Sequence, residues 1–92
     1  MLLLTKEIKE RLVKNHNENE ALRKENKELK RNKAVVKLFN PVGRGFWFLT
    51  ELDPATNIGW GGAKITDWDL GTISMTEIEN VKGPLGLGIE RD

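Results

Sequence analysis

The fold is decided by "AVVKLFNPVGRGFWFLTEL", residues 34–52. Its first six residues (34–39) are mainly β-branched or apolar, and residues 46–52 are again aromatic and aliphatic, which is the composition of two strands. Between them, "NPVGRG" (40–45) supplies the asparagine, proline and glycine residues that form turns. The stretch therefore predicts an antiparallel β-hairpin.

The residues after the hairpin predict further strands. "DPATN" (53–57) is a second turn, and "IGWGGAKI" (58–65) is a third strand whose glycines indicate a bulge or a close backbone approach. "TDWDLG" (66–71) turns the chain once more into a short strand, "TIS" (72–74). Together these segments predict an antiparallel meander of three to four strands.

A short helix and a glycine-rich tail close the chain. Ser74 and Glu77 have the spacing of a capping box, so a helix is expected over "EIENV". Lys82, Gly83 and Pro84 supply a basic last turn, a left-handed residue and a stop. The tail can then add an edge strand to the sheet.

Residues 5–33 predict one long helix at the other end of the chain. This segment contains no proline or glycine and consists mainly of Glu, Lys, Arg, Leu and Asn, with Thr5 as its N-cap. The predicted class is α+β: a long N-terminal helix, the meander, and the short capped helix with its tail. We expect a charged helical arm over residues 1–33 and a small α+β body over residues 34–92.

Composition excludes several classes of protein. A chain of 92 residues buries only a small core, so we expect one domain without a deep catalytic cleft. The absence of cysteine excludes disulfides, thiolate zinc sites and cysteine nucleophiles. The opening "MLLLTKEIKE" is too short for a signal peptide or a membrane span, which predicts a cytoplasmic protein.

Charge is unevenly distributed, although the formal net charge is only +1. Residues 6–33 hold ten Lys or Arg against six Glu, whereas residues 34–92 hold five Lys or Arg against eight Asp or Glu. The sequence therefore describes a basic helix joined to a mildly acidic body.

Five segments carry a family resemblance: "LLT" (3–5), "VKLFNP" (36–41), "FWFLTELDP" (46–54), "SMTEIEN" (74–80) and "VKGPLGLGIERD" (81–92). In this order they resemble the domain of unknown function 2958 family, a group of small uncharacterised bacterial, plasmid and phage proteins. The resemblance implies the fold and an origin in a mobile element, and it places the protein in a bacterial host cell. It implies no established activity.

Two features depart from the family pattern. Residues 13–33 are longer, more charged and more helical than the segment expected there, which is typical of an acquired module. The chain also ends at Asp92, where relatives continue with a few apolar residues.

The residue types that carry catalysis form no recognisable constellation. His16 is the only histidine and has no nucleophile or metal ligand at a known spacing, so a solvated helical histidine is the favoured interpretation. Asp67 and Asp69 lack the further ligands of a Mg²⁺ site, and Glu51 and Asp53 lack signs of acid–base chemistry. We expect no enzyme, no cofactor and no metal, with a metal-dependent hydrolase using Asp67 and Asp69 as the weakest alternative.

Aromatic side chains cluster in the strand region. An exposed row of them would resemble a stacking platform for single-stranded nucleic acid, which also needs a basic groove. The strand region offers only Lys37, Arg44 and Lys64 for that purpose. Binding of nucleic acid is therefore expected to be weak or absent, and an accessory role through the basic helix is the alternative.

Alternation along residues 46–52 makes both faces of that strand largely apolar. It places Phe46, Phe48, Thr50 and Leu52 on one face and Trp47, Leu49 and Glu51 on the other. We expect one face to pack on a helix and the other, around Trp47, to bind a host protein or protein complex. The candidate partner-binding residues are Trp47, Arg44, Trp60, Trp68, Asp67 and Asp69.

The N-terminal helix also carries a partial heptad pattern, which is consistent with a parallel zipper and a homodimer. Its candidate dimerisation residues are Leu12, Asn19, Leu22, Asn26 and Leu29. The pattern lasts about two heptads and places Asn15 at an apolar position, so a single solvated helix that packs through Ile8 and Leu12 stays open as the alternative.

These observations favour a small non-catalytic interaction protein of a phage or mobile element. Its most concrete form is an inhibitor of a bacterial defence complex, similar in role to an anti-CRISPR protein.

Overall fold

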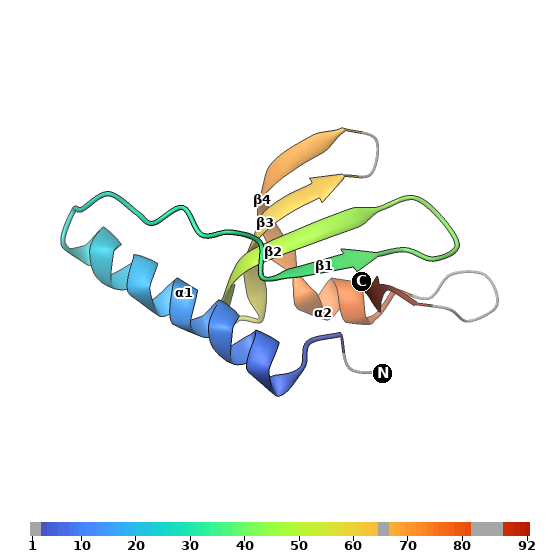
Figure 1. The fold of residues 1–92 in the computed structure, drawn as a ribbon, viewed down its shortest axis with the longest axis horizontal. Coiled ribbons are helices and arrows are strands. Elements are labelled where there is room, and N and C mark those ends of the chain that lie inside the picture. The colour runs from blue at the N-terminus through green and yellow to red at the C-terminus, as the bar shows by residue number, and fades with distance from the viewer. Residues whose placement is uncertain (1–2, 65–66, 82–87) are drawn as a thin grey trace.

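The computed structural model describes residues 3–64, 67–81 and 88–92 as an antiparallel sheet with two helices (Figure 1). The elements in chain order are α1 (Lys6–Lys24), β1 (Val36–Phe39), β2 (Phe46–Asp53), β3 (Ile58–Lys64), β4 (Trp68–Ser74), α2 (Met75–Glu79) and β5 (Glu90–Arg91). The strands lie in the order β4-β3-β2-β1-β5, and each neighbouring pair is antiparallel. The predicted α+β class is confirmed, with a sheet of five strands.

The predicted hairpin is formed by β1 and β2. Phe39 pairs with Phe46, and the amide of Asn40 donates to the carbonyl of Gly45 at 3.1 Å to close the turn. Gly45 has a φ of +134°, and a Cβ there would lie 2.6 Å from Cη2 of Trp47. The turn therefore requires glycine for both its backbone conformation and its space.

Both predicted N-caps are confirmed. The hydroxyl of Thr5 accepts from the amide of Ile8 at 3.2 Å, and the hydroxyl of Ser74 accepts from the amide of Glu77 at 3.2 Å. Each bond satisfies one of the amides that the first turn of a helix leaves without a partner. The stop predicted for α2 at Lys82, Gly83 and Pro84 lies outside the described residues.

The tail adds the predicted edge strand. Arg91 pairs with Leu38, and Glu90 pairs with Phe39. The pairing places β5 beside β1 at one edge of the sheet (Figure 1).

The core lies on one face of the sheet, which we call the closed face. It combines one residue of α1, two of α2, residues of β1, β2 and β4, and Ile89. Its buried members are Leu12, Val36, Leu38, Leu49, Leu52, Ile73, Met75, Ile78 and Ile89. α1 packs mainly against β2, and α2 lies behind the sheet (Figure 1). This burial supplies the main driving force for folding.

The N-terminal helix is shorter than predicted, because it ends at Lys24 and not near Lys33. Asn26 adopts a left-handed φ of 54°. The amide of Lys27 then donates to the carbonyl of Leu22 at 2.9 Å, and the amide of Asn26 donates to the carbonyl of Arg23 at 3.2 Å. This pair of bonds is a Schellman motif, which ends the helix and turns the chain back toward the sheet.

The fourth strand is longer than predicted, because it begins at Trp68. Residues 68–71, expected in a turn, continue the ladder with β3 through the pairs Lys64–Trp68, Ala63–Asp69, Gly62–Leu70 and Gly61–Gly71. Asp69 is therefore a strand residue, while Asp67 lies in a bend just before it.

A β-bulge in β2 corrects the predicted faces. The pairing with β3 shifts between Leu49 and Glu51, so the simple alternation is broken at Thr50. Leu49 and Leu52 consequently both lie in the core, and Trp47 packs against it on the same face. The bulge lies beyond Trp47, which shares its face with Leu49 as alternation predicts, but that face is the closed one, so the prediction that Trp47 faces a partner is wrong.

Two glycines of the β3–β4 ladder make a matched test of this packing. A Cβ at Gly61 would lie 1.8 Å from the carbonyl oxygen of Phe48, whereas a Cβ at Gly71 would meet nothing within 4 Å. We expect Gly61→Ala to lower the free energy of unfolding by roughly 3 kcal/mol or more, because β2 and β3 must separate. Gly71→Ala should change it by less than about 1 kcal/mol. Urea denaturation measures both, and similar losses in the two variants would contradict the packing described.

Candidate functional site

The second face of the sheet, which we call the open face, carries no packed helix in the described part of the chain. Its exposed apolar side chains come from three neighbouring strands: Phe46 of β2, Ile58 and Trp60 of β3, and Trp68 and Leu70 of β4. α1 and residues 28–32 form a wall beside it. The groove between this wall and the open face has a volume of about 1320 Å³.

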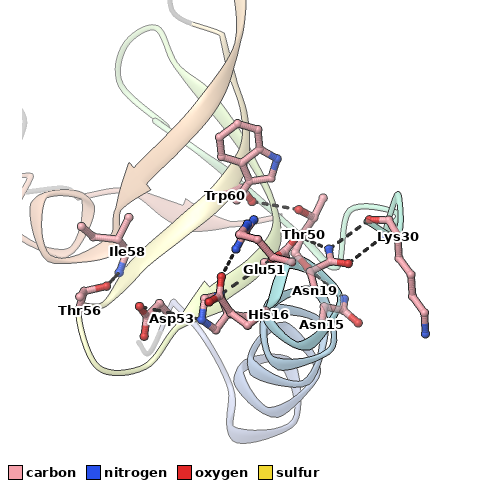
Figure 2. A network of polar contacts seen from close by, with 12 residues as sticks. Asn15, His16, Asn19, Lys30, Thr50, Glu51, Asp53, Thr56, Ile58 and Trp60 are labelled. Atoms are coloured by element: carbon pink, nitrogen blue, oxygen red, sulfur yellow. Dashed lines mark hydrogen bonds and ion pairs between the residues drawn. The ribbon is translucent and has the colours of Figure 1, made fainter. Parts of the chain in front are cut away.

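The wall of the groove is held by the side chain of Asn19, which is 1% exposed. Its Nδ2 donates to the carbonyl of Lys30 at 3.1 Å and to Oε2 of Glu51 at 2.7 Å, while its Oδ1 accepts from the amide of Lys30 at 2.8 Å (Figure 2). One amide group thus joins α1, the segment after it and β2. All of these bonds are buried in part, where an unpaired polar group would be costly.

A second asparagine of α1 satisfies the bulge. The carbonyl of Thr50 accepts from Nδ2 of Asn15 at 3.0 Å, and the hydroxyl of Thr50 donates to the carbonyl of Trp60 at 3.1 Å (Figure 2). Because a bulged residue loses its place in the ladder, its carbonyl needs such a partner. Asn15 and Asn19 therefore form a polar stripe that fixes α1 on β2.

His16 lies in the same stripe and faces two carboxylates of β2. Its Nδ1 is 3.9 Å from Oε1 of Glu51, and its Nε2 is 4.0 Å from Oδ2 of Asp53 (Figure 2). The predicted solvated histidine is thus half-buried between α1 and the sheet. Oδ1 of Asp53 also accepts from the amide of Ala55 at 2.9 Å, which fixes the carboxylate at the turn after β2.

Aromatic rings stack across the open face. The rings of Phe48 and Trp68 lie 5.1 Å apart between centroids, with an angle of 24° between their planes. They come from β2 and β4, on either side of β3. Gly62 is the β3 residue paired with Phe48, and a Cβ there would lie 3.6 Å from the Trp68 ring. The small residue leaves the space in which the rings can meet.

Only part of the predicted partner surface lies at the groove. Trp60 and Trp68 line it. Trp47 is on the closed face, and Arg44 is in the turn between β1 and β2. Asp67 and Asp69 are exposed but do not line the groove. The groove instead includes residues that the sequence analysis did not select for a partner: His16, Phe48, Glu51, Asp53, Ile58 and Leu70.

The predicted zipper does not fit the structure. Leu12 is in the core, and Asn19 is buried by contacts within its own chain. Asn26 ends the helix in a left-handed conformation, and Leu29 lies beyond it at the groove. Only Leu22 remains partly accessible on the helix, so the residues selected for dimerisation cannot form one seam.

The described residues contain no group of three or more His, Cys, Asp or Glu side chains arranged to hold a metal ion. Within the same residues, no helix is both long and apolar enough to cross a membrane.

A family model described as "protein of unknown function (DUF2958)" matches residues 3–92. The chain belongs to this family. The resemblance of the five sequence segments is thereby confirmed, and it extends through residues 13–33, which the model also covers. No curated protein and no solved structure gives a significant match.

The Asn19 contacts predict a large difference between two asparagines on α1. We expect Asn19→Ala to lower the free energy of unfolding by about 2–3 kcal/mol, because Oε2 of Glu51 and the backbone amide and carbonyl of Lys30 lose the bonds that Asn19 makes. Asn17→Ala, at an exposed position two residues earlier, should be neutral or slightly stabilising. Chemical denaturation compares them, and equal stability of the two variants would show that the Asn19 bonds do not hold the wall.

Proposed function

We propose that this DUF2958 protein is a non-catalytic binding module that receives a partner protein on the open face of its sheet. The supporting observation is the exposure of large apolar side chains on one face: 41% for Ile58, 47% for Trp60, 52% for Trp68 and 83% for Leu70. Contiguous exposed apolar surface on a small protein is typical of an interaction site. Tryptophan is also enriched among the residues that contribute most to binding energy.

The geometry of the groove favours binding over catalysis. Asn19 and Asn15 of the wall use their side-chain amides to hold the backbone and Glu51 in place. A wall fixed in this way gives a partner a surface that is already organised, which lowers the entropic cost of association.

The family supports a more specific form of this proposal. The resemblance implies relatives in phages, plasmids and bacteria, so the first partners to test are proteins of a bacterial host cell. An inhibitor of a defence complex acts by occupying a protein surface, and a rigid module of this size is suited to that task.

Nucleic acid is the alternative partner, and one observation favours it. Arg23, Lys30 and Arg31 line the same groove as Trp60 and Trp68. However, Arg23 is paired with Glu20, and Nζ of Lys30 lies 3.1 Å from Glu18. The groove also contains Glu28, Glu51 and Asp53. This mixture of charges lacks the continuous basic track that a phosphate backbone requires, so we favour a protein partner.

Partner capture tests the proposal with one pair of variants. Tagged wild-type protein, Leu70→Glu and Val42→Glu are incubated with lysate of a bacterial host, and captured proteins are quantified by mass spectrometry. Leu70 and Val42 are both exposed, so neither change disturbs the core. We expect Leu70→Glu to lose specific partners by roughly tenfold or more, because a charge enters the apolar patch. Val42→Glu, in the turn between β1 and β2, should retain them.

Capture of the same proteins in equal amounts by both variants would contradict a partner site on the open face. Submicromolar binding of a single-stranded oligonucleotide at physiological salt would favour the nucleic-acid alternative.

A further inference from the structure

Three aromatic rings of the open face are covered by the chain's own lysines. Nζ of Lys37 lies 4.8 Å from the ring centroid of Phe46 and 5.7 Å from that of Phe48, and Nζ of Lys64 lies 5.8 Å from that of Trp68. These distances are within the range in which a cation is attracted to the negative face of an aromatic ring.

Trp60 differs from these rings in its surroundings. It lines the groove with about half of its surface exposed, and no cation of the described residues lies over it. Its directly paired residue on β2 is Glu51, and Asp53 follows on the same strand opposite Ile58 (Figure 2). The exposed indole and the two carboxylates therefore line the same groove.

The charge around Trp60 is negative. Among the residues that the structure describes, Glu51 and Asp53 share only His16 as a cationic neighbour, at 3.9 and 4.0 Å. The three side chains carry a net negative charge whether His16 is neutral or protonated. Across the groove, Arg23 forms an ion pair with Glu20 and Lys30 forms one with Glu18. The other charged side chains on that side are Arg31 and Glu28, whose opposite charges add up to zero.

We infer that Trp60, Glu51 and Asp53 form a receptor for an arginine side chain of the partner protein. This inference rests on the proposed function and names the chemistry of the partner at that site. A guanidinium group is planar, so it stacks on an indole while its N–H groups donate to carboxylates. It would supply at Trp60 the cation that Lys37 and Lys64 supply to the other rings.

The inference is tested without the partner, by titrating the ¹⁵N-labelled protein with the peptide acetyl-Gly-Arg-Gly-amide. The matched probe contains citrulline, which has the shape of arginine without its charge. We expect the arginine peptide to shift the indole N–H signal of Trp60, with an affinity on the order of millimolar for a single side chain. The citrulline peptide should bind roughly tenfold or more weakly, as expected for a lost charge-assisted contact.

Two variants locate the effect. Asp53→Asn retains the oxygen that accepts from the amide of Ala55 and removes only the charge, so it should weaken binding of the arginine peptide at least about threefold without loss of the fold. Trp60→Leu removes the indole signal itself, so it is followed through the backbone amide signals of Glu51 and Asp53, whose shifts on addition of the arginine peptide it should abolish. Trp68→Leu, which alters a ring already covered by Lys64, should retain these shifts.

Equal binding of the arginine and citrulline peptides, or unchanged binding by Asp53→Asn, would overturn the inference. A stronger response of Trp60 to oligo(dT) than to the arginine peptide would also overturn it, in favour of nucleic acid. Because these titrations need no partner, their failure would leave partner capture by the open face as a separate result.

Discussion

The architecture around the groove depends on one buried amide. Asn19 accepts from the backbone amide of Lys30, donates to its carbonyl, and donates to the carboxylate of Glu51. A buried amide with free donors and acceptors is destabilising, so helix, return segment and strand are held in the arrangement that satisfies it. The groove exists because this arrangement places residues 28–32 beside the open face, where they form its wall.

The bulge in β2 is the second constraint, and it explains how one strand contributes residues both to the core and to the groove. The shift between Leu49 and Glu51 keeps Leu49 and Leu52 in the core and presents Glu51 toward α1 and Trp60. Asn15 satisfies the carbonyl that the bulge releases. The same few residues of β2 therefore determine the core, the attachment of α1 and the charge beside the exposed indole.

Local sequence signals were sufficient for much of this fold. The hairpin follows from two apolar runs and a Pro–Gly turn, and the caps at Thr5 and Ser74 follow from spacing alone. The glycines of β3 predicted a close backbone approach, which Gly61 makes against the carbonyl of Phe48. These features depend on neighbours in the chain, which a sequence displays directly.

The errors concern contacts between distant residues. Helical propensity continues past Lys24, but the helix ends there because Asn26 adopts a left-handed conformation. An asparagine at this position is the only local sequence signal for the end of the helix. The asparagines of α1 matched a weak heptad, whereas Asn15 and Asn19 in fact bond to β2 and to the return segment. Strict alternation placed Leu52 on the face opposite to Leu49, and the bulge that brings both into the core has no clear sequence signal. Trp47 was grouped correctly with Leu49, but the sequence did not show which of two apolar faces the helices cover. The groove could not be predicted either, because it is formed by contacts between α1 and three strands that lie far apart in the sequence.

The most direct test of the central role of Asn19 is amide hydrogen exchange at Lys30. This residue lies outside any helix or strand, and its N–H donates to Oδ1 of Asn19 at 2.8 Å. We expect the Lys30 amide to exchange at least about tenfold more slowly than its intrinsic rate, while the neighbouring Arg31 amide, for which no acceptor is found among the described residues, exchanges near its own intrinsic rate. Exchange of both amides at their intrinsic rates would contradict the account, because the wall of the groove would then not be held by Asn19.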